Sequence, residues 1–170
     1  MNTMQAIRER RSIRKFKAGA NVTREQVDTL LEAAMLAPSA CNTRPWEFVV
    51  VESREKLDKI ADAHPNAQMV RTASLAIVVC ALPEVQEQRE ICIGYYPQDC
   101  GAATQNILLA AVELGLGTCW CGVYPREKRV ADMKSLLGIE SLPFCVIAIG
   151  VPDEAPDARG GFEAEKVRYI

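Results

Sequence analysis

The feature that most constrains this fold is the apolar run LAIVVCAL, which fills residues 75–82. A second apolar run, FCVIAIG, fills residues 144–150. Continuous runs of this length are typical of strands that are buried on both faces. Both are far shorter than the roughly 20 residues that a helix needs to cross a bilayer. The sequence therefore predicts a buried sheet, with further strands near residues 48–51 and 118–123.

Helical patterns alternate with these strands. Thr23 and Gln26 form a capping box, the side-chain pattern that begins many helices, and an apolar stripe follows it. Asp99 is placed to cap the longest helix, which we expect to end near Leu114. Further helices are expected around residues 4–7, 53–61 and 125–137. Because no linker or repeat interrupts the 170 residues, we expect one α+β domain over residues 1–170.

The charge and the cysteines limit the setting in which the chain works. A net charge of −2 gives no overall case for binding nucleic acid or an anionic membrane. The cysteines are odd in number, and no secretion signal precedes them. We therefore expect reduced thiols and a cytoplasmic location. The seven are Cys41, Cys80, Cys92, Cys100, Cys119, Cys121 and Cys145.

The segment RERRSIRKFK, residues 8–17, concentrates positive charge near the start of the chain. Arg10, Arg11, Arg14 and the Ser12 hydroxyl lie within about one helical turn, and such a cluster repels itself unless an anion lies among it. The planar guanidinium matches phosphate oxygens. The segment thus indicates a phosphate site; the alternative is a solvated basic face.

The loop APSACNTRPWEF, residues 37–48, joins a helical pattern to a strand pattern. Pro38 and Pro45 fix its backbone, and Ser39 and Asn42 supply short polar groups. Such a loop can bond the edge of a planar polar ligand. The alternative is a rigid connector whose Trp46 belongs to the core.

A third segment, GLGTCWCG at residues 115–122, contains Gly-x-Gly. A dinucleotide-binding Gly-x-Gly follows a strand and opens a helix, whereas this one follows a helix and leads into a strand. It indicates instead a close backbone approach to a flat ligand, or simply a helix stop and a tight turn. Cys119, Cys121 and the single His64 lack the spacing of a zinc site, and His64 is expected at the surface.

Taken together, five segments resemble the nitroreductase family of FMN-dependent oxidoreductases. They occur in the family's order and cover nearly the whole chain. The segments are RRSIRKF, APSACNTRPWEFVVV, DCGAATQNILLAAVELGLGTCWCG, LLGI with LPFCVIAIGVP, and FEAEKVRY. The resemblance implies an α+β fold with a central mixed or antiparallel β-sheet flanked by helices. It also implies an intertwined homodimer with one FMN at each end of the interface, and a C-terminal tail of about residues 155–170 that extends onto the partner subunit.

The resemblance also implies roles for individual residues. Arg10, Arg11 and Ser12 would hold the FMN phosphate and ribityl chain, and Arg14 would lie near the flavin N1/O2 edge. The loop residues Pro38, Ser39, Ala40 and Asn42 would come from the partner subunit and line the flavin. The backbone amides of Cys121 and Gly122 would face flavin N5 and O4. Arg159 would bind phosphate, and Asn66 or Gln68 would bond the pyrimidine edge.

The activity that follows from the resemblance is an FMN-dependent NAD(P)H oxidoreductase. NADH or NADPH would give a hydride to flavin N5, and a small acceptor such as a nitroaromatic or a quinone would take the electrons. The alternatives are a flavoprotein of the same fold with other chemistry (dehalogenation, enone reduction or flavin breakdown) or a non-enzymatic FMN or thiol redox sensor. Two departures bear on the substrate: Arg44 stands where the family often has Gln, and residues 83–98 are short.

Overall fold

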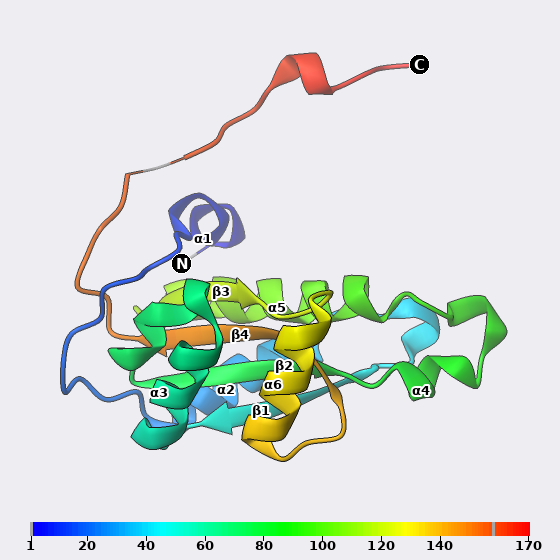
Figure 1. The fold of residues 1–170 in the computed structure, drawn as a ribbon. Helices are drawn as coiled ribbons and strands as arrows, with labels where there is room; N and C mark the ends of the chain where they lie inside the picture. The colour runs from blue at the N-terminus through cyan, green and yellow to red at the C-terminus, as the bar shows by residue number, and fades with distance from the viewer. Residues whose placement is uncertain (1, 158) are drawn as a thin grey trace.

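The computed structural model describes residues 2–157 and 159–170, and within them an antiparallel sheet forms the centre of the fold (Figure 1). The strand order is β1-β2-β4-β3, and every neighbouring pair is antiparallel. The strands are β1 (Trp46–Val51), β2 (Leu75–Ala81), β3 (Gly117–Gly122) and β4 (Leu142–Gly150). Both predicted apolar runs are confirmed as the two inner strands, and all seven residues of β2 are buried.

Helices cover both faces of the sheet, which explains why the inner strands carry no polar face. In Figure 1, α3 and α6 lie in front of the sheet and α2 and α5 behind it. Ile77 and Val79 of β2 belong to the core beneath α2 and α5, whereas Val78 and Cys80 belong to the core beneath α3 and α6. The helices are α1 (Thr3–Glu9), α2 (Arg24–Met35), α3 (Arg54–Ala63), α4 (Pro83–Glu87), α5 (Tyr96–Glu113) and α6 (Glu127–Leu137). Short 3-10 turns are η1 (Ala40–Asn42), η2 (Pro65–Arg71), η3 (Glu90–Cys92) and η4 (Ala164–Lys166).

Of two predicted helix starts, that of α2 is confirmed and that of α5 is wrong. The capping box of α2 is confirmed: the Gln26 amide donates to Thr23 Oγ1 at 3.3 Å, and the Thr23 amide donates to Gln26 Oε1 at 2.9 Å. The predicted start of the longest helix is wrong, because α5 begins at Tyr96 rather than after Asp99. Pro97 suits the first turn, where a missing amide proton costs nothing. Asp99 instead turns its buried carboxylate toward other elements.

The segment after α1 lies along the edge of β3 and beside the chain that leaves β4. The Ile13 amide donates to the Thr118 carbonyl at 2.8 Å, and the Lys17 amide donates to the Val151 carbonyl at 2.9 Å. Close approach is possible because position 117 is glycine: a Cβ there would lie 2.9 Å from the Ile13 side chain. The basic segment is therefore fixed to one end of the sheet by its backbone, which leaves its side chains available.

The C-terminal tail leaves the body of the fold (Figure 1). Residues 159–170 are exposed throughout, including the large side chains Phe162, Tyr169 and Ile170. Among the described helices, none is both long enough and apolar enough to span a bilayer.

Candidate functional site

The four residues expected at the phosphate end and Arg14, expected at the flavin N1/O2 edge, meet in one cavity of about 160 Å³. Arg10, Arg11, Ser12 and Arg14 reach it from the segment after α1, and Arg159 reaches it from the tail. The complete lining is Arg10, Arg11, Ser12, Arg14, Pro156, Asp157 and Arg159. We call this space the arginine cavity.

Hydrogen bonds to the backbone hold in place the two segments that line the arginine cavity. The Glu154 carboxylate accepts hydrogen bonds from the amides of Arg14 and Lys15, so it fixes the backbone. Arg11 Nε donates to the Asp157 carbonyl at 3.1 Å, which ties the tail to the cluster. Four guanidinium groups outnumber the carboxylates of Asp157, in the lining, and Glu154, beside it, and a phosphate matches the excess of positive charge in charge and geometry.

A second cavity, of about 360 Å³, adjoins the first through the shared residue Arg14. It contains the predicted Asn66, Cys121 and Gly122. Its lining is Arg14, His64, Asn66, Cys119, Trp120, Cys121, Gly122, Tyr124, Pro125, Arg126 and Arg129. We call this space the Gly122 cavity.

Gly122 presents open backbone to this cavity. A Cβ at Gly122 would meet nothing within 4 Å. The Val123 amide donates to the Phe144 carbonyl of the neighbouring strand at 3.0 Å, and antiparallel ladders alternate. The Gly122 amide therefore points away from β4, while the Cys121 amide points toward it. Of the two amides that the resemblance places against the flavin, that of Gly122 is the one available to a ligand.

His64 is buried beneath this strand, so the expectation of a surface histidine is wrong. Only 1% of its surface is exposed. Its Nδ1 accepts a hydrogen bond from the Asn66 amide at 3.3 Å, and its Nε2 lies 2.8 Å from the Gly122 carbonyl. Since Nδ1 accepts, the proton belongs on Nε2, which donates to Gly122. His64 thereby fixes the backbone at Gly122.

Asn66, rather than Gln68, lines the Gly122 cavity. Gln68 Nε2 donates to the Ala61 carbonyl at 2.6 Å, so its amide is committed to α3. The Asn66 carbonyl lies 3.4 Å from the Cys121 sulfur and is one of the acceptors that compete for its single proton. Of the two residues that the resemblance offers for a pyrimidine edge, Asn66 has the better placement.

Two cysteine thiols lie in the wall of the Gly122 cavity. A hydrogen bond from the Cys121 thiol lowers the pKa of Cys119 to about 7, and the nearby Arg14 cation adds to the effect. The same hydrogen bond, together with burial, raises the pKa of Cys121. Cys119 is thus the more acidic thiol of the pair.

The predicted flavin-lining loop and the segment after α1, which lines the arginine cavity, lie at opposite ends of the sheet (Figure 1). The loop leads into Trp46, which pairs with Ala81, whereas Ser12 bridges to Thr118 at the Leu75 end of β2. The six-residue length of a strand between those ends corresponds to about 20 Å. Pro38, Ser39, Ala40 and Asn42 therefore lie far from the arginine cavity of their own chain, and none of them is among the residues that line the Gly122 cavity.

Internal hydrogen bonds stiffen this loop. Ser39 Oγ accepts from the Arg44 amide at 2.9 Å, and the Ala40 amide donates to Asp99 Oδ1 at 3.0 Å. Cys41, Asn42 and Arg44 have φ between 50° and 54°. Asn tolerates that left-handed conformation, but it is unfavourable for the other two residues. The loop is held in its shape by contacts rather than by sequence preference alone.

A disulfide joins Cys41 of this loop to Cys92 of η3. The expectation that all seven cysteines are reduced is therefore wrong for these two; the other five are free and buried. Arg89 Nη1 donates to the Cys41 carbonyl at 3.2 Å, and Gln86 Nε2 donates to Thr43 Oγ1 at 3.2 Å. The short segment after β2 is thus fastened to the loop by one covalent bond and several polar contacts.

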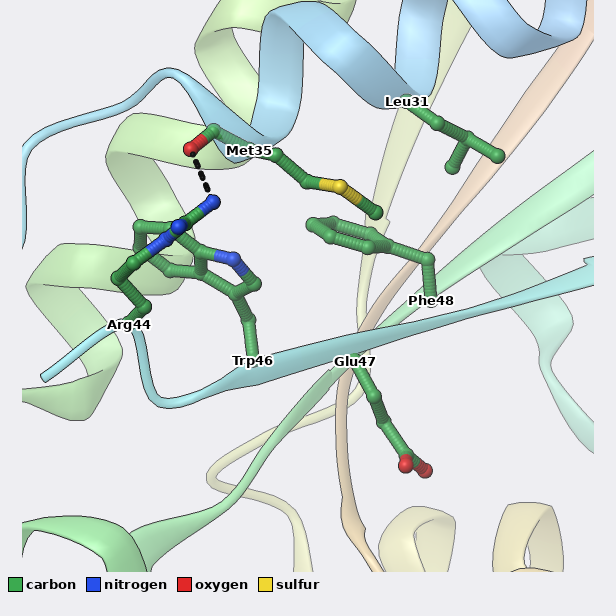
Figure 2. A pocket seen from close by; sticks show the side chains of 6 residues that line it. All are labelled: Leu31, Met35, Arg44, Trp46, Glu47 and Phe48. Atoms are coloured by element: carbon green, nitrogen blue, oxygen red, sulfur yellow. Dashed lines mark hydrogen bonds between the residues drawn. The ribbon is translucent and has the colours of Figure 1, made fainter.

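Arg44 has a structural role that the sequence did not reveal (Figure 2). Its Nη2 donates to the Met35 carbonyl at 3.1 Å, where a cation suits the C-terminal end of α2. Arg44 also lines an open cavity of about 500 Å³. The side chains of Met35 and Phe48 approach each other in this cavity, while Glu47 points to the other side of β1. Because this cavity borders the edge strand β1, it belongs to a surface distinct from the Gly122 cavity.

Several residues of the Gly122 cavity were missed from the sequence. Arg126 and Arg129 stand just before and within α6, and Trp120 is 38% exposed at the cavity wall. Their only sequence signal was proximity to Gly122. Among the described residues, no group of three or more His, Cys, Asp or Glu side chains is arranged to hold a metal ion.

The two adjoining cavities fit the chemistry of FMN, which has a phosphate at one end and a flat ring at the other. The excess of guanidinium groups suits the phosphate, and the outward Gly122 amide and Asn66 suit polar atoms at a ring edge. The match follows from the hydrogen-bond donors that these residues present to the two cavities.

Comparison with known proteins agrees with this assignment. A Methanothermobacter thermautotrophicus protein, provisionally named NADH dehydrogenase/NAD(P)H nitroreductase, is 45% identical over 98% of this chain and 86% of its own. The structure of a Parabacteroides distasonis protein with the same provisional name has a TM-score of 0.92 and 34% identity, covering 99% of this chain and 98% of its own. A provisionally named nitroreductase of Desulfovibrio desulfuricans, solved in complex with FMN, has a TM-score of 0.82 and 31% identity, covering 100% and 97%.

The nitroreductase family model matches residues 7–81 and 64–151. Most of the chain, including the inner strands and the segments that line both cavities up to residue 151, falls within the match. The chain therefore belongs to the nitroreductase family.

Proposed function

We propose that the chain is an FMN-dependent oxidoreductase that passes a hydride from NADH or NADPH to a small acceptor such as a nitroaromatic or a quinone. One observation carries the proposal: the arginine cavity and the Gly122 cavity share Arg14. A site that suits a phosphate thus lies next to a site that suits a flat polar ring. The names of the relatives, and the FMN bound in the Desulfovibrio desulfuricans structure, support the same reading.

Each part of the site has a defined task. When bound, FMN supplies the electron transfer itself, taking a hydride at N5 from the nicotinamide and yielding electrons to the acceptor. Arg10, Arg11, Ser12 and Arg159 hold the phosphate end. Arg14, at the junction of the two cavities, places a positive charge beside the N1/O2 edge, where it stabilises negative charge.

The ring end is held by neutral groups. The Gly122 amide donates toward the ring edge, and Asn66 meets the pyrimidine side. His64 keeps the Gly122 carbonyl fixed, so the amide direction is preset. His64 acts as a positioning residue, because both of its ring nitrogens are engaged and it has no free site for moving a proton.

The proposed assembly is a homodimer in which the loop of one chain completes the site of the other. Pro38, Ser39, Ala40 and Asn42 lie about 20 Å of strand length from the arginine cavity of their own chain. In this assembly the rigid loop lines the flavin site of the partner subunit. The tail, residues 155–170 apart from residue 158, which lies outside the described residues, extends onto the partner. The side chains of Phe162 and Tyr169, which are exposed in the single chain, then pack against the partner subunit.

A redox sensor of the same fold is the second candidate, and the Cys41–Cys92 disulfide favours it. The two candidates differ in their need for thiols. An enzyme in which Cys41, Cys119 and Cys121 are replaced by Ala keeps turnover near that of the unchanged protein. Loss of turnover with FMN content retained would favour the sensor.

The test of the main proposal is anaerobic mixing of the FMN-loaded protein with NADH or NADPH. The flavin absorbance should fall with one of them and return when a nitroaromatic or quinone is added. If neither nucleotide changes the absorbance, the proposal is wrong. Product identification over a substrate panel separates it from dehalogenation, enone reduction and flavin breakdown. We place the reaction in the cytoplasm, where NADH and NADPH are available.

A further inference from the structure

The Gly122 cavity carries positive charge that the proposed flavin contacts do not use. Three arginines line it, Arg14, Arg126 and Arg129, and no Asp or Glu is among its lining residues. Arg14 is shared with the arginine cavity. The other two come from the start of α6, on the opposite side of Gly122 in the sequence.

The two additional arginines are held close to Gly122. Arg129 Nη1 donates to the Gly122 carbonyl at 3.3 Å, and His64 donates to the same oxygen. That one bond leaves the remaining guanidinium donors of Arg129 for other partners. Arg126 is exposed, directly before the first helical residue Glu127. The ion pairs found among the described residues involve neither of them, whereas Lys128, between them, pairs with Asp132 at 2.7 Å.

Unpaired guanidinium groups in a cavity of this size attract an anionic oxygen group. With one arginine beside Gly122 and a second at the mouth, a phosphate or carboxylate can be bonded from two sides. A neutral molecule would leave both cations without a partner. The charge therefore selects among the molecules that enter the cavity.

We propose that Arg126 and Arg129 form a subsite for an anionic oxygen group carried by the molecule that reacts at Gly122. This group is either a phosphate of the nicotinamide nucleotide donor or a carboxylate or phosphate of the acceptor. The inference rests on the proposed function for the reaction, but the binding itself does not depend on turnover. Arg126 and Arg129 act here as specificity residues, separate from the cluster in the arginine cavity.

The experiment compares the double variant Arg126→Ala/Arg129→Ala with Lys128→Ala, a control that removes a cation from the same helix outside the cavity. The donors are NADH, NADPH and the neutral 1-benzyl-1,4-dihydronicotinamide. The acceptors are 4-nitrobenzoate and the neutral 4-nitrobenzamide. Binding of NAD+ and of inorganic pyrophosphate is followed through Trp120 fluorescence in a Trp46→Phe background, where Trp120 is the remaining tryptophan.

We expect the double variant to raise KM about tenfold for the anionic partner alone, because two charge-assisted hydrogen bonds are lost. A higher KM for NADH or NADPH, together with weaker binding of NAD+ and pyrophosphate, assigns the subsite to the phosphates of the donor. A rise for nitrobenzoate but not nitrobenzamide assigns it to the acceptor. Lys128→Ala should change none of these values, and the neutral donor should react equally well with all three proteins.

Two results overturn the inference. One is unchanged KM and unchanged binding of every anion in the double variant while the neutral donor still reacts. The other is loss of FMN from the double variant but not from Lys128→Ala, since the arginines would then hold the cofactor. Failure of all donors with the unchanged protein would count against the proposed function instead, and the anion-binding titrations would still decide the subsite.

Discussion

Cys41 and Cys92, which lie 51 residues apart, are joined by a disulfide that fastens the proposed flavin-lining loop to η3. The bond links the exposed Cys41 to Cys92, which is fully buried although its neighbour Ile91 is 82% exposed. It therefore couples the redox state of the chain to the geometry of a loop that we assign to the partner's site.

Replacing both cysteines, in the variant Cys41→Ser/Cys92→Ser, should lower the free energy of unfolding by about 2–4 kcal/mol, because the bond closes a long loop in the unfolded chain. Urea denaturation measures the change. A reductant should lower the stability of the unchanged protein but not of the variant. Titration of the unfolded, unreduced protein should give five thiols; seven would mean that the disulfide does not form.

Replacing Arg10 by Ala should weaken FMN binding, because the phosphate loses a charge-assisted partner. A loss of roughly 1.5–3 kcal/mol corresponds to about ten- to a hundredfold in Kd. Titration of the cofactor-free protein with FMN measures it. Lys17→Ala is the control, since Lys17 belongs to the same basic segment but does not line the arginine cavity. Equal Kd values for the two variants would remove Arg10 from the site.

A shared site predicts complementation between chains. Arg10→Glu damages the phosphate end, and Ala40→Trp fills space at the loop, so each homodimer should bind FMN poorly. In a heterodimer of the two, one site combines both defects and the other has neither. Differently tagged chains, co-expressed and purified together, should carry one FMN per heterodimer. Heterodimers without FMN would contradict the exchange of the loop between subunits.

The acidity of Cys119 predicts a pH dependence. Its pKa is lowered from 9.0 to about 7, first by the Cys121 thiol and then by Arg14. A lowered pKa means that the folded state releases the proton first, so the stabilisation is complete above pH 9 and is lost as the pH falls through about 7. The Cys119 contribution is on the order of 2–3 kcal/mol at most, and above pH 9 the raised pKa of Cys121 opposes it, because the folded state keeps a proton that the unfolded state releases.

Thiolate absorbance against pH measures this pKa directly. Cys121→Ala removes the hydrogen bond to the thiolate, so the pKa of Cys119 should rise toward its ordinary value. A Cys80→Ala variant is the control, because burial raises the pKa of Cys80 to about 12 and that thiol stays protonated through this range. A transition near pH 9 in the unchanged protein would contradict the assignment.

Local patterns in the sequence were sufficient where neighbouring residues decide the structure. The apolar run of β2 and the capping box of α2 are such cases, because burial on both faces and a three-residue hydrogen-bond pair each leave a short signature. The arginine segment also left a local signature, because its charge density favours an anion, although the sequence left a solvated basic face as the alternative. Its meeting with Arg159 was expected only from the family resemblance.

Contacts between distant segments could not be read in the same way. The pairing of Cys41 with Cys92 depends on where η3 lies, and seven cysteines permit many pairings. His64 is buried because its ring bonds Gly122, which lies 58 residues further on. Asp99 looked like a helix cap, but Ala40 and Gln86 use its carboxylate. Arg126 and Arg129 had no pattern of their own until α6 placed them beside Gly122.

The most direct measurement of the central claim is the absorption spectrum of the purified protein, with identification of any chromophore released on denaturation. The proposed function predicts flavin bands and one FMN per chain, either as purified or after incubation with FMN. A protein that stays colourless after incubation with FMN would contradict the assignment of both cavities to a cofactor, and with it the proposed reaction.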